Sequence, residues 1–430
     1  MAPTKARIDL FTGWPAPSLL PINQLKDAAA AALSDPCISS PGLGYGPDEG
    51  YGPLKENIAR LLTDFYGPPE PVSSERICIT GGASQNMACI LQVFTDPAVT
   101  KYVWMVEPAY YLARRIFEDA GFGAGRIRGV PGGDDAELGG IDIEFLEAAL
   151  EDSQEQCPVV SQTPTKPSYA YRKFYKHVIY CVPTFSNPSG ITMPLEKRRA
   201  LVQLARKFDA LVVCDDVYDF LHWEVPGSEP NQECYSPLPR LVDLDRHFDG
   251  GPTEMFGNVV SNGSFSKIVG PGCRVGWAEG TGKFIYGLSK AGSTRSGGAP
   301  SQLVSTFSNG LLADGSLAGV IRKELVPACA RRYLALSSAA RTHLVPLGAS
   351  FDEVSGGYFV WLKLPEPLAA EEVVGKALEE EDLVIGPGGL FAVSEGSGIA
   401  KRVRLCFMWE DETKLAEGVE RLARVMQRLL

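Results

Sequence analysis

The sequence has few residues of the kinds that bind metals at recognisable spacings. It contains four histidines in 430 residues, and they lie far apart along the chain. Its ten cysteines are scattered, and none of them forms a CxxC pair. These spacings match no zinc or iron–sulfur site, so we expect no bound metal and interpret the histidines as structural or surface residues. Several cysteines lie in apolar runs, which predicts reduced thiols in the core of a cytoplasmic protein.

Long hydrophobic runs and an excess of basic charge are also absent. No run reaches the roughly 18 apolar residues needed to span a membrane, and no apolar signal core follows the N-terminus. Lys and Arg number 41 against 52 Asp and Glu, which gives a net charge of −11. Bulk electrostatics therefore argue against a nucleic-acid partner, and we expect neither a membrane partner nor secretion.

Strand and helix patterns alternate along much of the chain. Short apolar runs bounded by turn residues predict strands, and amphipathic segments between them predict helices. The predicted strands are 76–80, 102–106, 177–182, 210–214 and 259–264, with helices at 84–94 and 195–208. This order predicts an α/β fold whose large domain has a mostly parallel sheet covered by helices. A smaller α+β domain is indicated by a long helix from about 315, strands at 356–364 and 403–407, and a helix at 411–429.

Two proline-bearing stretches interrupt this alternation. Residues 152–176 carry three prolines, and residues 224–257 carry four before position 240. Both stretches are predicted to be surface loops.

The segment from Ser264 to Arg274 carries the most chemistry. Lys267 follows a β-branched strand and lies among small residues, and Arg274 comes seven positions later on a glycine-flanked turn. A lysine amine can form a Schiff base with an aldehyde cofactor, and a guanidinium can bind a phosphate through two hydrogen bonds. Together they predict a site for pyridoxal phosphate, whose chemistry needs a lysine imine and an anion site.

Other candidate residues lie where predicted strands end. Gly81 and Gly82 lead into a helix whose free amides favour a phosphate, although plain tight turns use the same residues. Asp215 ends a buried strand and can keep a pyridine nitrogen protonated, whereas Asp216 is expected to cap the following turn. Tyr218 can hydrogen-bond a cofactor phenolate or simply pack in the core.

Three further side chains complete the set of candidates. Asn187 can donate to the same phenolate from a loop stiffened by Pro188, or it can form an Asx turn. Tyr110 can stack on a flat ring, or it can be a core tyrosine. Arg404 lies in an apolar strand and needs an anionic partner, which a substrate carboxylate would provide.

These motifs make the chain resemble the class I and II aminotransferases of the fold-type I pyridoxal-phosphate enzymes. The resemblance is to the branch that contains 2-aminoadipate and kynurenine aminotransferases and their fungal relatives. It runs from Gly13 to the C-terminal helix, and its most specific motif is Ser264-Phe265-Ser266-Lys267 with Arg274. It implies an N-terminal arm with part of the small domain at 1–65, a large cofactor-binding domain at 66–310 and a C-terminal small domain at 311–430.

The resemblance also implies a role for each candidate. Lys267 would form the Schiff base and act in catalysis with Asp215 and Tyr218. The cofactor would be held by these three residues together with Ala83, Ser84, Tyr110, Asn187, Ser264, Ser266 and Arg274. The substrate would contact Arg404 through its α-carboxylate, and also Gly13 and Asn187. Tyr45 would reach the phosphate of a neighbouring subunit, which implies a homodimer with shared active sites.

The chain departs from the family pattern in three places. Ala83 stands where relatives usually have Ser or Thr, so a side-chain bond to the phosphate is lost while the backbone bond remains. Trp14 occupies a position where a smaller residue is common in the aminoadipate-like branch, and residues 152–176 form a longer stretch than in close bacterial relatives. These last two departures leave the substrate open, but not the cofactor.

The expected activity is ping-pong transfer of an amino group between an L-amino acid and a 2-oxo acid. One alternative is a lyase or synthase on the same scaffold, which uses the same inventory of residues. A second is a non-catalytic cofactor-binding regulator. The regulator is less expected because the resemblance begins near residue 8 and leaves no room for a preceding DNA-binding module.

Overall fold

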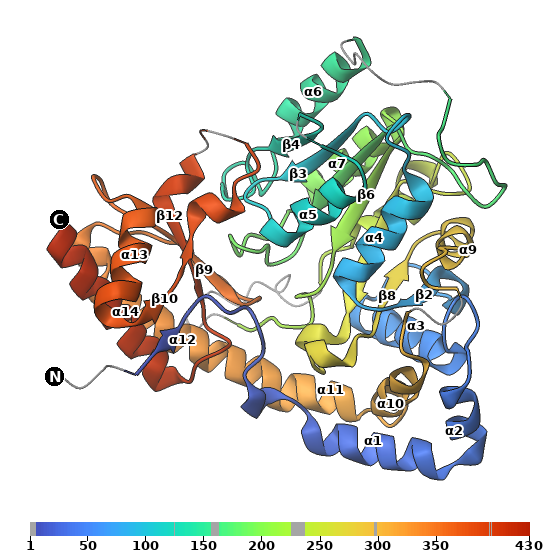
Figure 1. Ribbon diagram of the computed structural model, residues 1–430, viewed down its shortest axis with the longest axis horizontal. Coiled ribbons are helices and arrows are strands. Elements are labelled where there is room, and N and C mark those ends of the chain that lie inside the picture. The colour runs from blue at the N-terminus through green and yellow to red at the C-terminus, as the bar shows by residue number, and fades with distance from the viewer. Residues whose placement is uncertain are drawn as a thin grey trace.

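The computed structural model describes residues 6–123, 125–155, 163–224, 237–295, 299–394, 396 and 398–430. A seven-stranded sheet flanked by helices lies at its centre (Figure 1). In spatial order its strands are β2 (Ile77–Thr80), β8 (Gly276–Glu279), β7 (Val259–Ser264), β6 (Ala210–Asp215), β5 (His177–Cys181), β3 (Tyr102–Val106) and β4 (Ile127–Val130). β8 pairs antiparallel with both β2 and β7, and the other pairings are parallel. The predicted α/β fold with a mostly parallel sheet is confirmed.

Alternating side chains of the central strands pack into two different layers of helices. In β6, Leu211 and Val213 pack on one side, whereas Val212 and Cys214 pack on the other. The first layer contains α4 (Ala83–Phe94), α5 (Tyr111–Asp119) and α9 (Gly282–Ser289). The second contains α6 (Ile143–Glu155), α7 (Leu195–Lys207) and α8 (Leu241–His247). Every residue of β6 is buried, as expected for a parallel strand that is covered on both faces.

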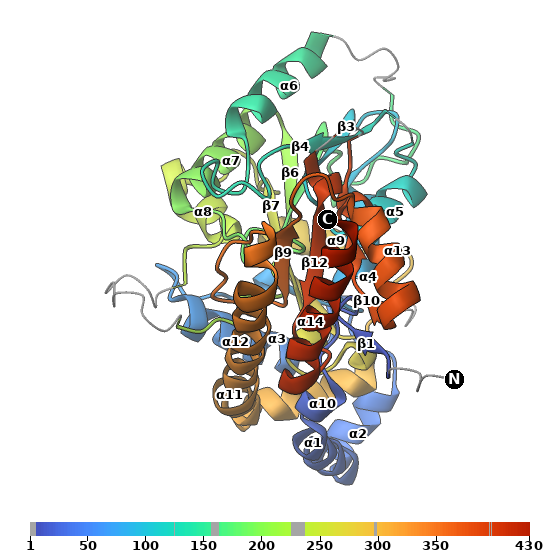
Figure 2. The same cartoon turned by 90° about the vertical axis from the view of Figure 1, so that its left-hand side faces the viewer.

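The C-terminal part builds a second, smaller sheet. It contains β11 (Gly386–Pro387), β12 (Arg402–Cys406) and β9 (Phe359–Lys363), all antiparallel. Around it lie α12 (Val326–His343), α13 (Ala370–Glu381) and α14 (Glu412–Leu429), and Figure 2 shows α12 and α14 side by side. The apolar residues of α14 recur at helical spacing and are buried, so the amphipathic pattern at 411–429 correctly predicted this helix.

The N-terminal residues contact both parts of the molecule. β1 (Ile8–Asp9) pairs with β10 (Leu383–Val384) next to the small sheet. The arm continues as α1 (Ile22–Ser34), α2 (Pro36–Leu43) and α3 (Gly52–Tyr66). All three pack against α10 (Gln302–Ala313). The domain boundary predicted at residue 310 falls inside α10. The long helix predicted from about 315 is divided into α11 (Ser316–Val320), a π-helical turn at Ile321–Leu325 and α12.

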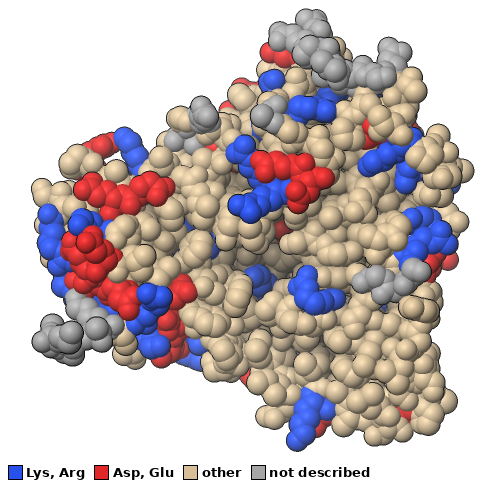
Figure 3. Space-filling model, viewed as in Figure 1, with Lys and Arg blue, Asp and Glu red and all other residues tan. Residues whose placement is uncertain are grey.

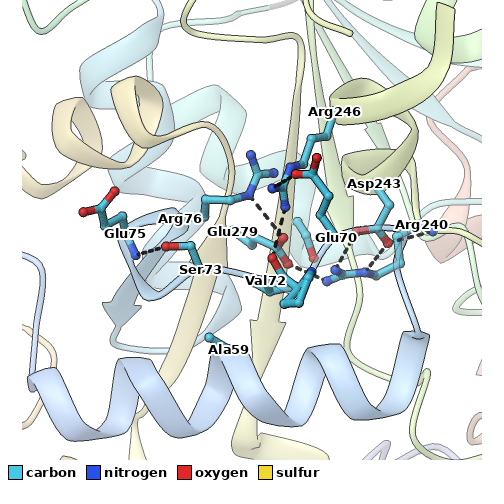
Figure 4. A network of polar contacts seen from close by, with 12 residues as sticks. Ala59, Glu70, Val72, Ser73, Glu75, Arg76, Arg240, Asp243, Arg246 and Glu279 are labelled. Carbon is cyan, nitrogen blue, oxygen red and sulfur yellow. Dashed lines mark hydrogen bonds and ion pairs between the residues drawn. The ribbon is translucent and has the colours of Figure 1, made fainter.

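The prediction of a surface loop at 224–257 is wrong for its second half. Residues 225–236 lie outside the described part of the chain, but Arg240 and the helix α8 that follows it are buried. Figure 4 shows the Arg240 guanidinium between Asp243 and Glu279 of β8. Its nitrogens lie 2.9 Å from the Asp243 carboxylate and 2.7 Å from that of Glu279. Prolines before position 240 lead into a helix here, because proline is tolerated next to a helix start.

The prediction of a surface loop at 152–176 is also wrong at both ends. α6 continues to Glu155, and the Tyr175 side chain is buried with its hydroxyl donating to the Gly257 carbonyl at 2.6 Å. Residues 156–162 lie outside the described part of the chain.

Across all of the described residues, no helix has the length and apolar character required to cross a membrane.

Candidate active site

A cavity of about 420 Å³ opens between the carboxyl ends of the central strands and the small sheet. Figure 3 shows this face hollowed at its centre, with Lys or Arg atoms at the floor of the hollow. The cavity brings together all but one of the predicted site residues: Gly13, Ala83, Ser84, Tyr110, Asn187, Asp215, Tyr218, Ser264, Ser266, Lys267, Arg274 and Arg404. Residues from both parts of the chain therefore meet around one volume.

One end of the cavity is built as an anion site. Ala83 and Ser84 form the first turn of α4, where backbone amides lack partners within the helix. Arg274 reaches this turn and donates from Nη2 to the Gly81 carbonyl at 2.6 Å. The backbone of Gly82 has φ +96°, and a Cβ added there would lie 2.8 Å from Arg274 Nη2. Glycine is therefore required for the guanidinium to come this close to the helix start.

Two serine hydroxyls lie on the same wall. Ser264 ends β7, and its Oγ donates to Ser266 Oγ at 2.8 Å while accepting from the Ser266 amide at 3.1 Å. The hydroxyls, the amides of the α4 first turn and Arg274 form a set of donors that fits a phosphate.

Asp215 is the last residue of β6 and is buried beneath the cavity. Its Oδ2 accepts a hydrogen bond from the Tyr180 hydroxyl at 2.9 Å, and its Oδ1 has no partner among the described residues. Burial raises the pKa of Asp215 to about 6, while the Tyr180 hydroxyl and the Lys267 charge act in the opposite direction. A buried, unpaired carboxylate oxygen in this place fits the protonated ring nitrogen of pyridoxal phosphate.

The Lys267 amine lies in the same cavity. Its Nζ donates to the Gly13 carbonyl at 2.7 Å and lies 5.9 Å from the centre of the Tyr218 ring. Burial, with a contribution from Arg404, lowers the pKa of Lys267 to about 8. A substantial fraction of the amine is therefore neutral near that pH and available as a nucleophile or base.

Two of the predicted tyrosines, Tyr110 and Tyr218, line the cavity. Burial raises the pKa of Tyr110 to about 12 and raises that of Tyr218 above its ordinary value, and Asp215 contributes in the same direction. Both side chains therefore stay protonated at neutral pH and can donate hydrogen bonds.

Arg404 approaches the cavity from the small sheet and contacts Asn187, which lies in the loop that follows β5 of the large sheet. Its Nη1 donates to Asn187 Oδ1 at 2.8 Å, and its Nη2 donates to the Phe11 carbonyl at 2.6 Å. Its Nε has no partner, and Arg404 forms no ion pair among the described residues. Burial disfavours the charged form of the guanidinium and lowers the pKa of Arg404. An anionic partner would offset this cost of burying the charge. A ligand carboxylate can act as this partner.

Sequence reasoning missed the aromatic side chains around this guanidinium. The ring centres of Phe359, Phe391 and Phe11 lie 4.1, 4.8 and 5.0 Å from Arg404 Cζ. They come from three separate segments, so no local pattern in the sequence indicated them.

The partners of the acidic residues after β6 were also missed. Tyr180 lies on the neighbouring strand β5, and strand alternation places it on the same face as Asp215. The prediction that Asp216 caps a turn is wrong. Its Oδ2 accepts from the Ser261 hydroxyl at 2.5 Å, and burial raises its pKa to about 7.

Tyr45 is the one predicted residue that does not line the cavity. Its side chain is 87% exposed and borders a groove of about 1040 Å³. Arg274 lines both the groove and the cavity, so the groove reaches the anion site from outside.

Comparisons with known proteins agree with this geometry. A model of the class I and II aminotransferases matches residues 19–422. An uncharacterized protein of Saccharomyces cerevisiae is 35% identical over 403 residues, covering 90% of this chain and 88% of that protein. A 2-aminoadipate transaminase of Thermus thermophilus is 30% identical over 418 residues, covering 97% of this chain and 89% of that protein.

Solved structures give the same result. Kynurenine aminotransferase of Pyrococcus horikoshii, solved in complex with PMP, matches with a TM-score of 0.79 and 26% identity, covering 99% of this chain and 91% of that chain. The cavity's donors and its unpaired carboxylate fit the same cofactor. The chain therefore belongs to the class I and II aminotransferases and is a pyridoxal-phosphate-dependent enzyme of fold type I.

Proposed function

We propose that this aminotransferase acts on L-amino acids with aromatic or bulky apolar side chains. The observation that carries the proposal is the charge inventory of the cavity. Its charged lining residues are Asp215, Lys267, Arg274 and Arg404. Cofactor binding and the substrate α-carboxylate account for all four, so the described lining has no further cation for a carboxylate on the substrate side chain.

The remaining wall supports the same substrate class. Phe11, Trp14, Tyr111, Leu112 and Phe359 line the cavity and supply a largely apolar surface. Trp14 is 58% exposed at the mouth, and its ring packs edge-on against Trp409 with centres 6.0 Å apart. Aromatic side chains stack well on such a surface.

Each predicted residue has a role that its position supports. Ser264, Ser266, Arg274 and the amides of Ala83 and Ser84 hold the cofactor phosphate. Asp215 Oδ1 would accept a hydrogen bond from the protonated ring nitrogen, Tyr110 would stack on the ring, and Tyr218 and Asn187 would donate to its phenolate oxygen. When bound, pyridoxal phosphate supplies an aldehyde, whose oxygen is exchanged for the substrate's amino group, and a ring that accepts electrons.

The other residues of the site act on the substrate. Arg404 binds the α-carboxylate in the orientation that Asn187 sets, and the backbone of Gly13 lies at the mouth. Lys267 Nζ takes the proton from the substrate Cα and would deliver it to the cofactor carbon that receives the amino group, which a partly neutral, buried amine does efficiently.

A screen of the amine-donating half-reaction tests the proposed substrate class. We expect kcat/KM for L-phenylalanine, L-tyrosine or L-kynurenine to exceed that for L-glutamate or L-2-aminoadipate by about tenfold or more, the discrimination an apolar pocket can supply. Equal or faster reaction of the dicarboxylic amino acids would show that a cation outside this lining binds the second carboxylate, and would refute the proposal.

We also infer a homodimer in which Tyr45 contacts the phosphate site of the neighbouring subunit. Tyr45 and Leu43 are 87% and 71% exposed beside the groove that leads to Arg274. Exposed apolar side chains next to a deep groove are typical of a protein interface. Sedimentation should give twice the chain mass, and Tyr45→Ala should weaken cofactor binding. A monomer with full cofactor affinity would contradict both inferences.

The cysteines support a cytoplasmic location, which we propose on this ground alone. The eight cysteines in the described ranges are free thiols, and six of them are buried. Reduced thiols are usual in the cytosol. Microscopy of a fluorescent fusion tests the location, and a signal confined to an organelle would contradict it.

A further inference from the structure

Asp134 is a carboxylate outside the cavity that contacts two neighbours of Arg404. It lies in the loop that follows β4 of the large sheet. Its Oδ2 lies 2.9 Å from Arg402 Nε and accepts from Trp361 Nε1 at 3.3 Å. Arg402 precedes Arg404 by two residues on β12, and Trp361 is directly opposite Arg404 in the β9–β12 pairing. One carboxylate of the large domain therefore contacts the residues beside and across from Arg404.

The Asp134–Arg402 pair is shielded from solvent. The two side chains are 20% and 19% exposed. A pair with this burial is screened less than a surface ion pair, and removing one partner leaves the other charge poorly solvated. The pair is thus suited to fixing the position of β12 relative to the large domain.

Trp361 extends the contact to the guanidinium itself. Its ring packs edge-on against Phe391, with centres 5.5 Å apart, and the Phe391 ring centre lies 4.8 Å from Arg404 Cζ. Asp134, Trp361 and Phe391 therefore form a continuous series of contacts that ends on the face of the Arg404 side chain.

The large-domain side of this contact is firmly held. The Gly133 amide, next to Asp134, donates to the Glu107 carbonyl at 2.9 Å. The Glu107 side chain accepts from the amides of Val393 and Ser394 at 2.8 and 3.1 Å, close to Phe391 in the chain. Asp134 therefore projects from an anchored loop.

We propose that Asp134 is a positioning residue for the substrate α-carboxylate. It holds Arg402 and Trp361 so that Arg404, on the same face of β12 as Arg402, presents its guanidinium to the cavity. Two-point binding of a carboxylate depends on the alignment of the guanidinium, so a small shift of β12 weakens it. The inference rests on the proposed role of Arg404.

The test compares ligands with and without a carboxylate. The variants are Asp134→Ala, Asp134→Asn, Arg404→Ala and the double variant D134A/R404A, with Glu137→Ala as the control for loss of an exposed carboxylate in the same loop. Calorimetry on the cofactor-loaded enzyme gives the dissociation constant of 3-phenylpropanoate, a carboxylate that cannot react. Half-reaction rates are measured with L-phenylalanine and with 2-phenylethylamine, which lacks the carboxylate.

We expect Asp134→Ala to weaken 3-phenylpropanoate about tenfold and to raise KM for L-phenylalanine by a similar factor with a small change in kcat. The amine should react within about twofold of the parent rate, and Asp134→Asn should lose less because it retains an acceptor for Trp361. The cofactor absorption spectrum and cofactor affinity should not change. In the R404A background, Asp134→Ala should have no further effect on the carboxylate, because coupled residues are non-additive.

The outcomes test the carboxylate-binding role of Arg404 and the positioning role of Asp134 separately. If Arg404→Ala does not weaken 3-phenylpropanoate, the proposed role of Arg404 fails. If Arg404→Ala weakens it but Asp134→Ala does not, or if Asp134→Ala slows the amine as much as the amino acid, the positioning role of Asp134 is refuted while that of Arg404 stands. If Asp134→Ala does not fold, the Asp134→Asn variant and Arg402→Ala decide between the same outcomes.

Discussion

Replacing Gly82 by alanine should damage cofactor binding and stability by separable amounts. The Gly82 backbone has φ +96° and ψ 169°, a conformation essentially restricted to glycine, where another residue costs on the order of 1–3 kcal/mol, and this cost falls on the folded protein with or without cofactor. The added Cβ would lie 2.8 Å from Arg274 Nη2, so the guanidinium has to move away from the α4 start. A hydrogen bond to a charged group is worth about 1.5–3 kcal/mol, which predicts a ten- to hundredfold loss of pyridoxal-phosphate affinity.

The assay is a titration of the apoenzyme with pyridoxal phosphate, followed by absorbance, together with thermal unfolding of the apoenzyme. Gly272→Ala is the matched control, because it adds the same methyl group nearby, where nothing lies within 4 Å of the new Cβ. The control should bind the cofactor normally. Unchanged cofactor affinity in Gly82→Ala, or an equal loss in Gly272→Ala, would refute the argument that Gly82 makes room for Arg274.

Four further predictions concern the groups in and beneath the cavity. Lys267→Ala should abolish turnover and the cofactor–lysine absorbance, and steady-state transamination in this variant would contradict the assignment. In the parent apoenzyme, the rate of cofactor attachment to Lys267 should rise with pH through about 8, because burial lowers this pKa and only the neutral amine attacks; a midpoint near the ordinary lysine value would show that the amine is not shifted. Arg404→Ala should lower kcat/KM for amino acids about a hundredfold, or ~2.7 kcal/mol, and affect amines lacking a carboxylate much less; equal losses for both would rule out the carboxylate role. Tyr180→Phe removes a donor that lowers the pKa of Asp215, so that pKa should rise and the cofactor spectrum should change with pH at a higher value than in the parent; an unshifted pH dependence would show that this hydrogen bond does not tune Asp215.

Three of the residues that sequence reasoning placed in the cavity share one property. Lys267, Asp215 and Asn187 each lie at or just after the carboxyl end of a strand, and the carboxyl ends of parallel strands meet at one edge of a sheet. A polar residue at such a position can therefore be assigned to the site without knowing the strand order. Arg404 was identifiable for a different reason, because an arginine in an apolar strand requires an anion.

The errors come from contacts between distant segments. The residues around Arg404, such as Phe359 and Phe391, depend on strand register and loop packing, which no local pattern encodes. β8 is antiparallel within an otherwise parallel sheet and was not predicted. α8 was missed because its preceding prolines suggested a loop, whereas buried ion pairs of Arg240 hold this segment inside the fold.

The two cations that meet the substrate are already hydrogen-bonded to the chain's own N-terminal segment. Lys267 Nζ donates to the Gly13 carbonyl, and Arg404 Nη2 donates to the Phe11 carbonyl. These carbonyls act as internal competitors, so the affinity of any carboxylate ligand is the difference between two sets of hydrogen bonds. An inhibitor that also donates to the freed carbonyls of Phe11 and Gly13 should gain affinity over a simple substrate analogue, because it restores the bonds that it displaces.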